Sequence, residues 1–152
     1  MAGERSATPF ARYPGGGRVL LGAPAGGDGT ARLGYGVPAV RQCGTACAYC
    51  QRDLGSTYEG WLDLTIDHVV PMNAVNSDIP REWLNDLANI VTCCAACNGF
   101  LNRYVAAISG VVTQDDFFEL RDQCFHEKCD RAMARHVKER ERFEKFHAAI
   151  GP

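Results

Sequence analysis

Apolar and polar side chains alternate over one short stretch near the middle of the chain. The apolar positions are Leu62, Leu64, Ile66 and His68, and the polar positions between them are Asp63, Thr65 and Asp67. This period of two predicts a β-strand with one buried face, which Pro71 ends. Residues 90–92 form another apolar run, which we interpret as a second short strand.

Helical patterns follow both predicted strands. A short helix is expected to begin near Pro80, with Ser77 or Asp78 as its cap. A further helical pattern runs from about residue 95 to residue 108 and ends at Gly110. The order strand, loop, strand, helix therefore predicts a small ββα unit.

The last forty residues have a helical pattern throughout. Thr113 and Asp116 are spaced as in a capping box, with Asp in place of the usual Glu. The apolar positions that follow predict one helix and then a longer, less regular one. The first set is Phe117, Phe118, Leu120, Cys124 and Phe125, and the second is Cys129, Met133, Val137, Phe143 and Phe146. We interpret the charged run at residues 138–142 as a solvated helix face.

Residues 1–38 differ from the rest in composition. They hold ten of the sixteen glycines and four of the seven prolines. Such a segment buries too little apolar surface to offset its ordering entropy, so we predict a flexible, disordered, weakly basic N-terminal arm. An arm that follows phosphates is the alternative to a solvated tail, but its four arginines are scattered.

The length of 152 residues suits one domain with extensions. We divide the chain into the arm at 1–38, a core domain at 39–110 and a helical extension at 111–152. No apolar run is long enough to span a bilayer, so no membrane partner is expected. No secretory signal is visible, which favours a cytoplasmic location where thiols stay reduced.

Two CxxC pairs are the strongest chemical signal in the chain. Cys47 and Cys50 form one pair, and Cys94 and Cys97 form the other. Four thiolates in this spacing are typical of a structural Zn²⁺ site. Cys43 and Cys93 lie close enough in sequence to be substitute ligands, but they do not complete a CxxC pair. A redox role for these thiols is disfavoured, since no thioredoxin-like βαβ context surrounds them.

Asp67, His68 and Asn98 add a second kind of chemistry. Neighbours on a strand point to opposite faces. We therefore expect the strand to end near Asp67, so that a loop brings its carboxylate and the His68 imidazole to one site. A carboxylate and the amide oxygen of Asn98 suit a hard divalent cation, Mg²⁺ or Mn²⁺. His68 would then deprotonate a water that attacks phosphorus.

These motifs together resemble the HNH endonuclease family, in its four-cysteine zinc branch with stand-alone bacterial members. The resemblance implies an α+β fold: a small zinc-pinned ββα-metal core, treble-clef-like, with a helical C-terminal extension. It implies that His68 is the general base and that Asp67 is a cation ligand. Asn89 matches the central asparagine, which ties the connecting loop to the ββα unit. Asn98 matches the final position, where this chain has Asn in place of His.

The function expected from these residues is metal-dependent hydrolysis of DNA phosphodiester bonds. Arg103 is a candidate phosphate contact. Charge argues against tight DNA binding without a cation, because residues 43–110 carry three arginines against seven acidic side chains. The alternative is a non-catalytic zinc module that binds nucleic acid or protein. Target specificity is expected to be weak, shape-based, or supplied by homodimerisation or a partner.

Overall fold

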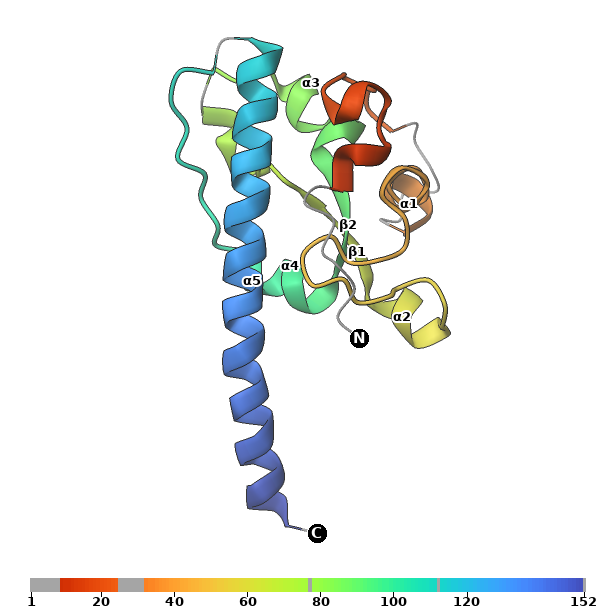
Figure 1. The fold of residues 1–152 in the computed structure, drawn as a ribbon, viewed down its shortest axis with the longest axis vertical. Helices are drawn as coiled ribbons and strands as arrows, with labels where there is room; N and C mark the ends of the chain where they lie inside the picture. Colours follow the sequence, from red (N-terminus) through yellow and green to blue (C-terminus); the bar gives the residue numbers. More distant parts are fainter. Residues whose placement is uncertain (1–8, 25–31, 77, 112, 152) are drawn as a thin grey trace.

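A two-stranded antiparallel sheet forms the centre of the fold in the computed structural model (Figure 1). The structure describes residues 9–24, 32–76, 78–111 and 113–151. Strand β1 (Leu64–His68) pairs with β2 (Ile90–Cys94), so that Leu64 lies opposite Cys94 and His68 opposite Ile90. Every residue of β2 is buried. The sheet therefore places the end of β1 beside the start of β2.

The first predicted strand is confirmed in position but not in its pattern of burial. It begins at Leu64, because Leu62 belongs to helix α2 (Tyr58–Asp63), where the Thr57 side chain accepts a hydrogen bond from Gly60 N. Leu64 is buried, whereas the other residues of β1 are only half-buried. The expected contrast of one buried and one solvated face is therefore wrong. In a sheet of only two strands, other elements of the fold cover part of each face of β1.

Helix α4 (Ala95–Leu101) follows β2 without a break, so the predicted order strand, loop, strand, helix is confirmed. The helix is shorter than the predicted span of 95–108. It ends at Leu101, and the chain turns there with a hydrogen bond from Tyr104 N to Leu101 O. The turn lets the buried Tyr104 donate its hydroxyl proton to Glu127, 2.8 Å away. A tertiary contact thus decides where α4 ends.

The loop between the strands contains helix α3 (Arg81–Leu84) and two 3₁₀ turns, Met72–Asn76 and Leu87–Asn89. The predicted helix near Pro80 is confirmed, but its predicted cap is not. Pro80 itself occupies the cap position without a side-chain hydrogen bond, which excludes Asp78, and Ser77 lies outside the described residues.

Helix α5 (Gln114–Ile150) is one continuous helix of 37 residues, so the prediction of two helices is wrong. Two of the three residues between the apolar groups, Glu127 and Lys128, are good helix formers, and no glycine or proline interrupts the segment. The capping box is confirmed: Asp116 N donates to Thr113 Oγ1, and Thr113 N donates to Asp116 Oδ2. The first half of α5 packs on the core, and the second half extends beyond it (Figure 1).

Part of the N-terminal segment belongs to the core. Two 3₁₀ turns, Pro9–Arg12 and Pro14–Gly17, bury Phe10 and Tyr13. A π-helical turn, Arg32–Gly36, continues into helix α1 (Val37–Cys43). The predicted flexible arm is therefore wrong for residues 9–24. Two aromatic side chains supply the burial that the glycine content concealed.

The buried Arg121 of α5 connects this segment to the rest. Its Nη1 donates to Gly17 O at 2.6 Å and to Ala88 O at 3.0 Å, and its guanidinium lies 3.7 Å from the Phe10 ring centroid.

The predicted domain divisions at residues 38 and 110 remain predictions. Among the described residues, no helix has both the length and the apolar character needed to cross a bilayer.

Candidate functional site

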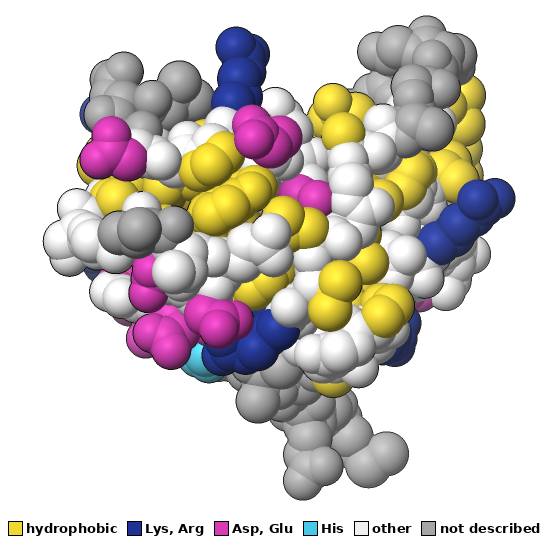
Figure 2. All heavy atoms as spheres, turned by 90° about the horizontal axis from the view of Figure 1, so that it is seen from above, with side chains coloured by type: hydrophobic (Ala, Val, Ile, Leu, Met, Phe, Trp, Pro, Cys, Tyr) yellow, Lys and Arg dark blue, Asp and Glu magenta, His cyan; other side chains and the backbone are white. Residues whose placement is uncertain are grey.

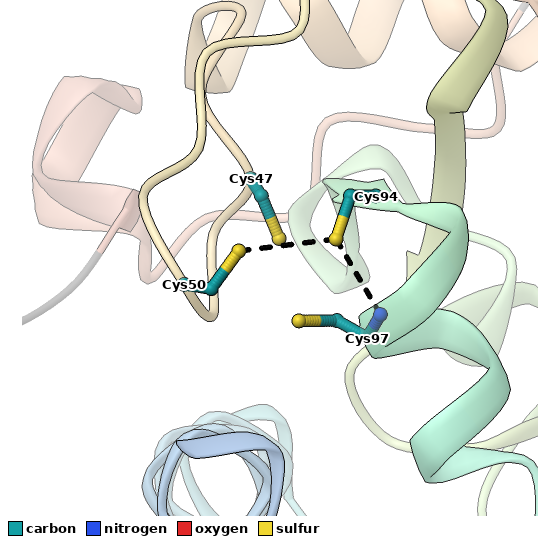
Figure 3. A group of neighbouring side chains, drawn as sticks. All are labelled: Cys47, Cys50, Cys94 and Cys97. Atoms are coloured by element: carbon teal, nitrogen blue, oxygen red, sulfur yellow. Dashed lines mark hydrogen bonds between the residues drawn. The ribbon is translucent and has the colours of Figure 1, made fainter. Parts of the chain in front are cut away.

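Two separate turns bring four cysteines together. Cys47 and Cys50 lie in a tight loop, where Cys47 N donates to Arg52 O and Gln51 has a left-handed φ of 63°. Cys94 ends β2, and Cys97 lies in the first turn of α4. The backbone amide of Cys97 donates a hydrogen bond to Cys94 Sγ at 3.4 Å (Figure 3). All four sulfurs lie within 4.8 Å of one another.

The cluster has the dimensions of a tetrahedral metal site. A Zn–S bond of about 2.3 Å implies about 3.8 Å between sulfurs, and Cys50 Sγ lies 3.8 Å from Cys94 Sγ. Hydrogen bonds from the other thiols, that of Cys50 foremost, lower the pKa of Cys47, whereas the contact with Cys47 raises the pKa of Cys97. The thiols thus share hydrogen bonds in which the Cys47 thiolate is favoured and the Cys97 thiol stays protonated. The four sulfurs together could hold a metal such as zinc.

The two alternative cysteine ligands are not members of the four-cysteine group, although the Cys93 thiol contacts that of Cys47. Cys43 Sγ contacts the Tyr13 hydroxyl at 3.1 Å and Ile90 O at 3.6 Å. Burial raises the pKa of its thiol. Cys93 donates its S–H to the carbonyl of Cys94. Within the described part of the chain, the group of possible ligands is the two CxxC pairs.

His136 of α5 is a neighbour of the cluster that the sequence analysis missed. Its Nε2 lies 3.2 Å from Cys97 Sγ, and its ring meets Phe100 edge to face at 5.1 Å. An imidazole N–H that points at a ligating sulfur is a typical outer-shell partner of a metal site. No local pattern reveals it, because 39 residues separate it from Cys97.

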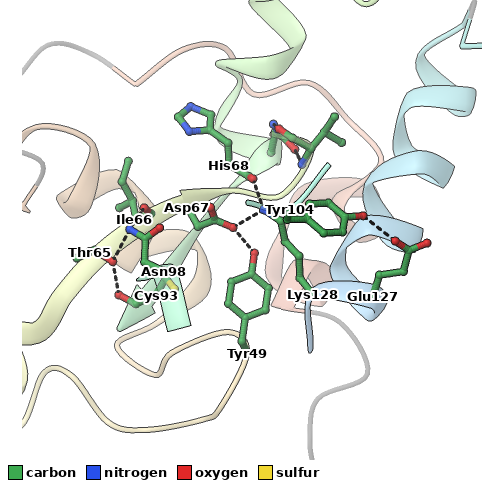
Figure 4. Close-up of polar contacts among 12 residues, drawn as sticks. Tyr49, Thr65, Ile66, Asp67, His68, Cys93, Asn98, Tyr104, Glu127 and Lys128 are labelled. Carbon is green, nitrogen blue, oxygen red and sulfur yellow. Dashed lines mark hydrogen bonds and ion pairs between the residues drawn. The ribbon is translucent and has the colours of Figure 1, made fainter. Parts of the chain in front are cut away.

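Asp67 is held by two side chains that the sequence analysis did not connect with it. The Lys128 ammonium lies 2.7 Å from Asp67 Oδ2, and the Tyr49 hydroxyl donates to the same oxygen (Figure 4). Lys128 is only 2 % exposed, and it also donates to the backbone carbonyl of His68 at 2.7 Å. A buried ammonium therefore neutralises the carboxylate.

Asp67 and His68 do not converge through a loop, so that expectation is wrong. Both residues lie inside β1, paired with Val91 and Ile90, and the ladder continues with Val69 N donating to Asn89 O. Their side chains consequently point to opposite sides of the strand (Figure 4). Pairing with the fully buried β2 keeps β1 extended beyond the point where we expected it to end.

His68 has an unusual environment. Burial lowers the pKa of its imidazole, which a hydrogen bond with Asn85 and the charge of Asp67 only partly oppose. Its Nε2 is buried and has no hydrogen-bond partner among the described residues. The ring is thus neutral near pH 7 and keeps one nitrogen unsatisfied.

The two asparagines have different surroundings. Asn98 donates from Nδ2 to Thr65 Oγ1 at 3.2 Å and to Ile66 O at 3.5 Å. Thr65 and Asp67 lie two residues apart on β1, so Asn98 stands on the Asp67 side of the strand. Asn89 is fully buried, exchanges two hydrogen bonds with the backbone of Val70, and donates to Leu84 O. These contacts are those expected of a loop tether.

Arg103 lies in a groove between α4 and α5 of about 580 Å³, which we call the α4–α5 groove. Gly99, Phe100 and Arg103 line one wall, and Arg131, Arg135 and Lys138 line the other. The sequence analysis singled out Arg103 alone. The spacing of the other three at i, i+4 and i+7 places them on one face of α5, a pattern that is visible in the sequence of residues 131–138.

Comparison of this chain with protein-family models, curated proteins and solved structures finds no match. The site must therefore be interpreted from its own geometry.

Proposed function

We propose that this protein is a zinc-stabilised endonuclease of the HNH type that hydrolyses DNA phosphodiester bonds, with His68 as its general base. The observation that carries the proposal is the His68 imidazole, which burial keeps neutral and whose Nε2 has no hydrogen-bond partner among the described residues. It lies on a strand–loop–strand–helix unit with a four-cysteine cluster. Because Asp67 leaves β1 on the opposite side from His68, the proposal requires the phosphate to reach both side chains around the edge of the strand.

A purely structural role explains His68 less well. A buried polar nitrogen without a partner costs about 1–3 kcal/mol. Structural histidines normally satisfy both ring nitrogens, whereas an acceptor nitrogen kept free is what a general base requires. In the proposed step, Nε2 takes a proton from water as its oxygen bonds to phosphorus. The bond to the 3′ oxygen breaks, and that oxygen takes a proton from solvent, which leaves 5′-phosphate and 3′-hydroxyl ends. His68 then returns its proton to solvent.

The proposed ligands of the catalytic cation are Asp67 and Asn98. They lie on the same side of β1, and a carboxylate with an amide oxygen suits Mg²⁺ or Mn²⁺. The contacts of Tyr49 and Lys128 both go to Oδ2 of Asp67, which is how outer-shell partners orient a carboxylate. Bound there, a divalent cation would polarise the phosphate and stabilise the leaving oxygen. The nearby Lys128 ammonium reduces the affinity for it.

In the same proposal, the four-cysteine cluster holds Zn²⁺ and acts only in folding. Four sulfur ligands leave no open position for water or substrate, which is typical of structural zinc. The cluster joins the loop before β1 to the start of α4, and so sets the position of Asn98 relative to β1.

The test is nicking of supercoiled plasmid with Mn²⁺ or Mg²⁺. We expect the wild-type protein to nick and His68→Ala to lose nicking by at least about a hundredfold, with the fold and bound zinc unchanged. His147→Ala is the matched control, because this histidine is exposed near the free end of α5. Full activity in His68→Ala would exclude the mechanism.

A second candidate is a non-catalytic zinc module that binds nucleic acid. The ion pair between Lys128 and Asp67 favours it, since a buried ammonium already neutralises the carboxylate without a divalent cation. This candidate predicts DNA binding by the wild type with no cation-dependent nicking in the same assay.

A further inference from the structure

We infer that the α4–α5 groove binds the phosphates of a DNA strand and leads that strand towards Asp67. The choice of DNA as the ligand rests on the proposed function, whereas the groove and its charge do not. The groove has about 580 Å³ of space, enough for a backbone segment.

The charge of the groove is of one sign. Arg103 enters from the turn after α4, and Arg131, Arg135 and Lys138 enter from α5, while none of the described lining residues is acidic. Arg135 pairs at 2.8 Å with Glu139, which also pairs with Arg142. Positive charge therefore exceeds negative charge in a protein whose formal net charge is −2. Phosphate is the anion that arginine recognises best in such a setting.

This concentration of basic side chains differs from another part of the surface. On the face seen from above, Lys and Arg side chains stand apart from one another, and acidic side chains gather on one side (Figure 2). A basic groove on a mildly acidic protein concentrates binding of polyanions at one place.

Aromatic rings help to hold two of the guanidinium groups in position. Arg131 lies 4.9 Å from the centroid of the Tyr104 ring, and Arg135 lies 5.7 Å from that of Phe100. Cation–π contacts of this length restrict long side chains without neutralising them. Less conformational entropy is then lost when a phosphate binds.

The length of the basic face matches a short run of phosphates. Arg131 and Lys138 are seven residues apart on α5, or about 10 Å along the helix axis. Phosphates of one strand of duplex DNA advance by about 3.4 Å each along its axis. The face of α5 therefore spans about three phosphates.

Residues that line the groove are neighbours of the proposed site along the chain. Gly99, on one wall, directly follows Asn98, and Arg131 lies one helical turn after Lys128, which contacts Asp67. A strand that follows the basic side chains is thus directed to the proposed cation ligands. Gly99 leaves room for this, because a Cβ placed there meets no atom within 4 Å.

The experiment measures binding of a duplex oligonucleotide to the zinc-loaded protein without added divalent cation, over a series of salt concentrations. The test variant is Arg103→Gln with Arg131→Gln, one change from each wall. The matched control is Arg81→Gln with Arg140→Gln, which removes the same charge from exposed positions outside the groove. A third variant, Gly99→Leu, fills the groove without changing its charge.

We expect the groove variant to bind more weakly and to lose about 1.8 from the slope of log K against log salt, at about 0.9 for each phosphate. Gly99→Leu should also bind more weakly, while the control pair keeps the wild-type slope. The inference is overturned if wild-type protein does not bind DNA, if the groove variant keeps the wild-type slope, or if the control pair loses as much.

Plasmid nicking by the same proteins separates this inference from the proposed function. Wild-type protein that binds through the groove without nicking refutes the nuclease and supports the groove. Wild-type protein that nicks, with binding unaffected in the groove variant, refutes the groove and supports the nuclease.

Discussion

Lys128 is the residue that most changes the chemical interpretation of this site. It lies in the interior with its ammonium on Asp67 Oδ2, so the proposed cation ligand already has a positive partner. A divalent cation that binds Asp67 must displace the Lys128 ammonium or bind against its repulsion. The residue thus sets the cation affinity of the proposed site.

Replacement of Lys128 by Met should reveal this competition. Without a divalent cation, we expect the unfolding free energy to fall by about 3 kcal/mol, because Asp67 loses its buried partner. Mn²⁺ should restore part of the loss, and it should raise the melting temperature of Lys128→Met more than that of the wild type. In the double variant Asp67→Asn, Lys128→Met, the extra response to Mn²⁺ should vanish. An equal Mn²⁺ response in wild type and Lys128→Met would contradict the assignment of Asp67 as a cation ligand.

The lowered pKa of His68 leads to a prediction about pH. The neutral imidazole is the form that accepts a proton, and burial keeps it neutral below its ordinary pKa of 6.5. As the pH falls, kcat/KM for nicking should therefore stay on its plateau until the pH is below 6.5. The hydrogen bond with Asn85 raises the pKa of His68 and so opposes the effect of burial. Asn85→Ala should therefore move the midpoint of the pH profile of kcat/KM to a still lower pH. A midpoint at or above 6.5 in the wild type would count against His68 as the base.

At the scale of elements, the cysteine cluster connects three segments that are short on their own. It joins the Cys47 loop, the end of β2 and the first turn of α4. Helices and strands of five to seven residues have little stability in isolation. A metal bound to the cluster would therefore supply part of the folding free energy of this unit.

Cys97→Ala should consequently lose its bound zinc and unfold the core, as measured by metal analysis and far-ultraviolet circular dichroism. Cys43→Ala is the control, because the Cys43 sulfur contacts Tyr13 and Ile90 O and lies outside the cluster. It should keep one zinc per chain. A folded Cys97→Ala protein with stoichiometric zinc would refute the assignment.

At the scale of the whole molecule, α5 has two halves with different roles. Phe117, Phe118 and Phe125 pack into the core, whereas every residue from Glu141 to Ile150 is exposed. Stability should depend on the first half and be nearly indifferent to the end of the second.

Truncation after Arg140 tests this division. We expect the unfolding free energy to change by less than about 1 kcal/mol, since the ion pair of Arg142 with Glu139 is a surface pair. Phe118→Ala, for comparison, should lose about 3–5 kcal/mol. Denaturant titration of both variants gives the two values. A loss of several kcal/mol on truncation would show that the exposed end has a partner, such as a second copy of the chain.

The sequence by itself determined the features that depend on close spacing. The two CxxC pairs, the capping box at Thr113 and Asp116, and the order of two strands and a helix all arise from residues near one another in the chain. Local geometry decides such features, because hydrogen-bond patterns and ligand spacing repeat over a few residues. The role of Asn89 as a tether stays a prediction of the family resemblance; its side chain bonds the backbone of Val70 and Leu84.

Only the tertiary structure decided which residues of the core the side chains of α5 contact. It places Lys128 on Asp67 across 61 residues, His136 on Cys97 across 39, and Arg121 on Gly17 across 104. It also joins Arg103 to the basic face of α5. A charged residue on a helix has the same local pattern whether it faces solvent or a buried partner. The packing of the helix selects between these outcomes, because burying a charge is tolerated only where a partner compensates the lost hydration.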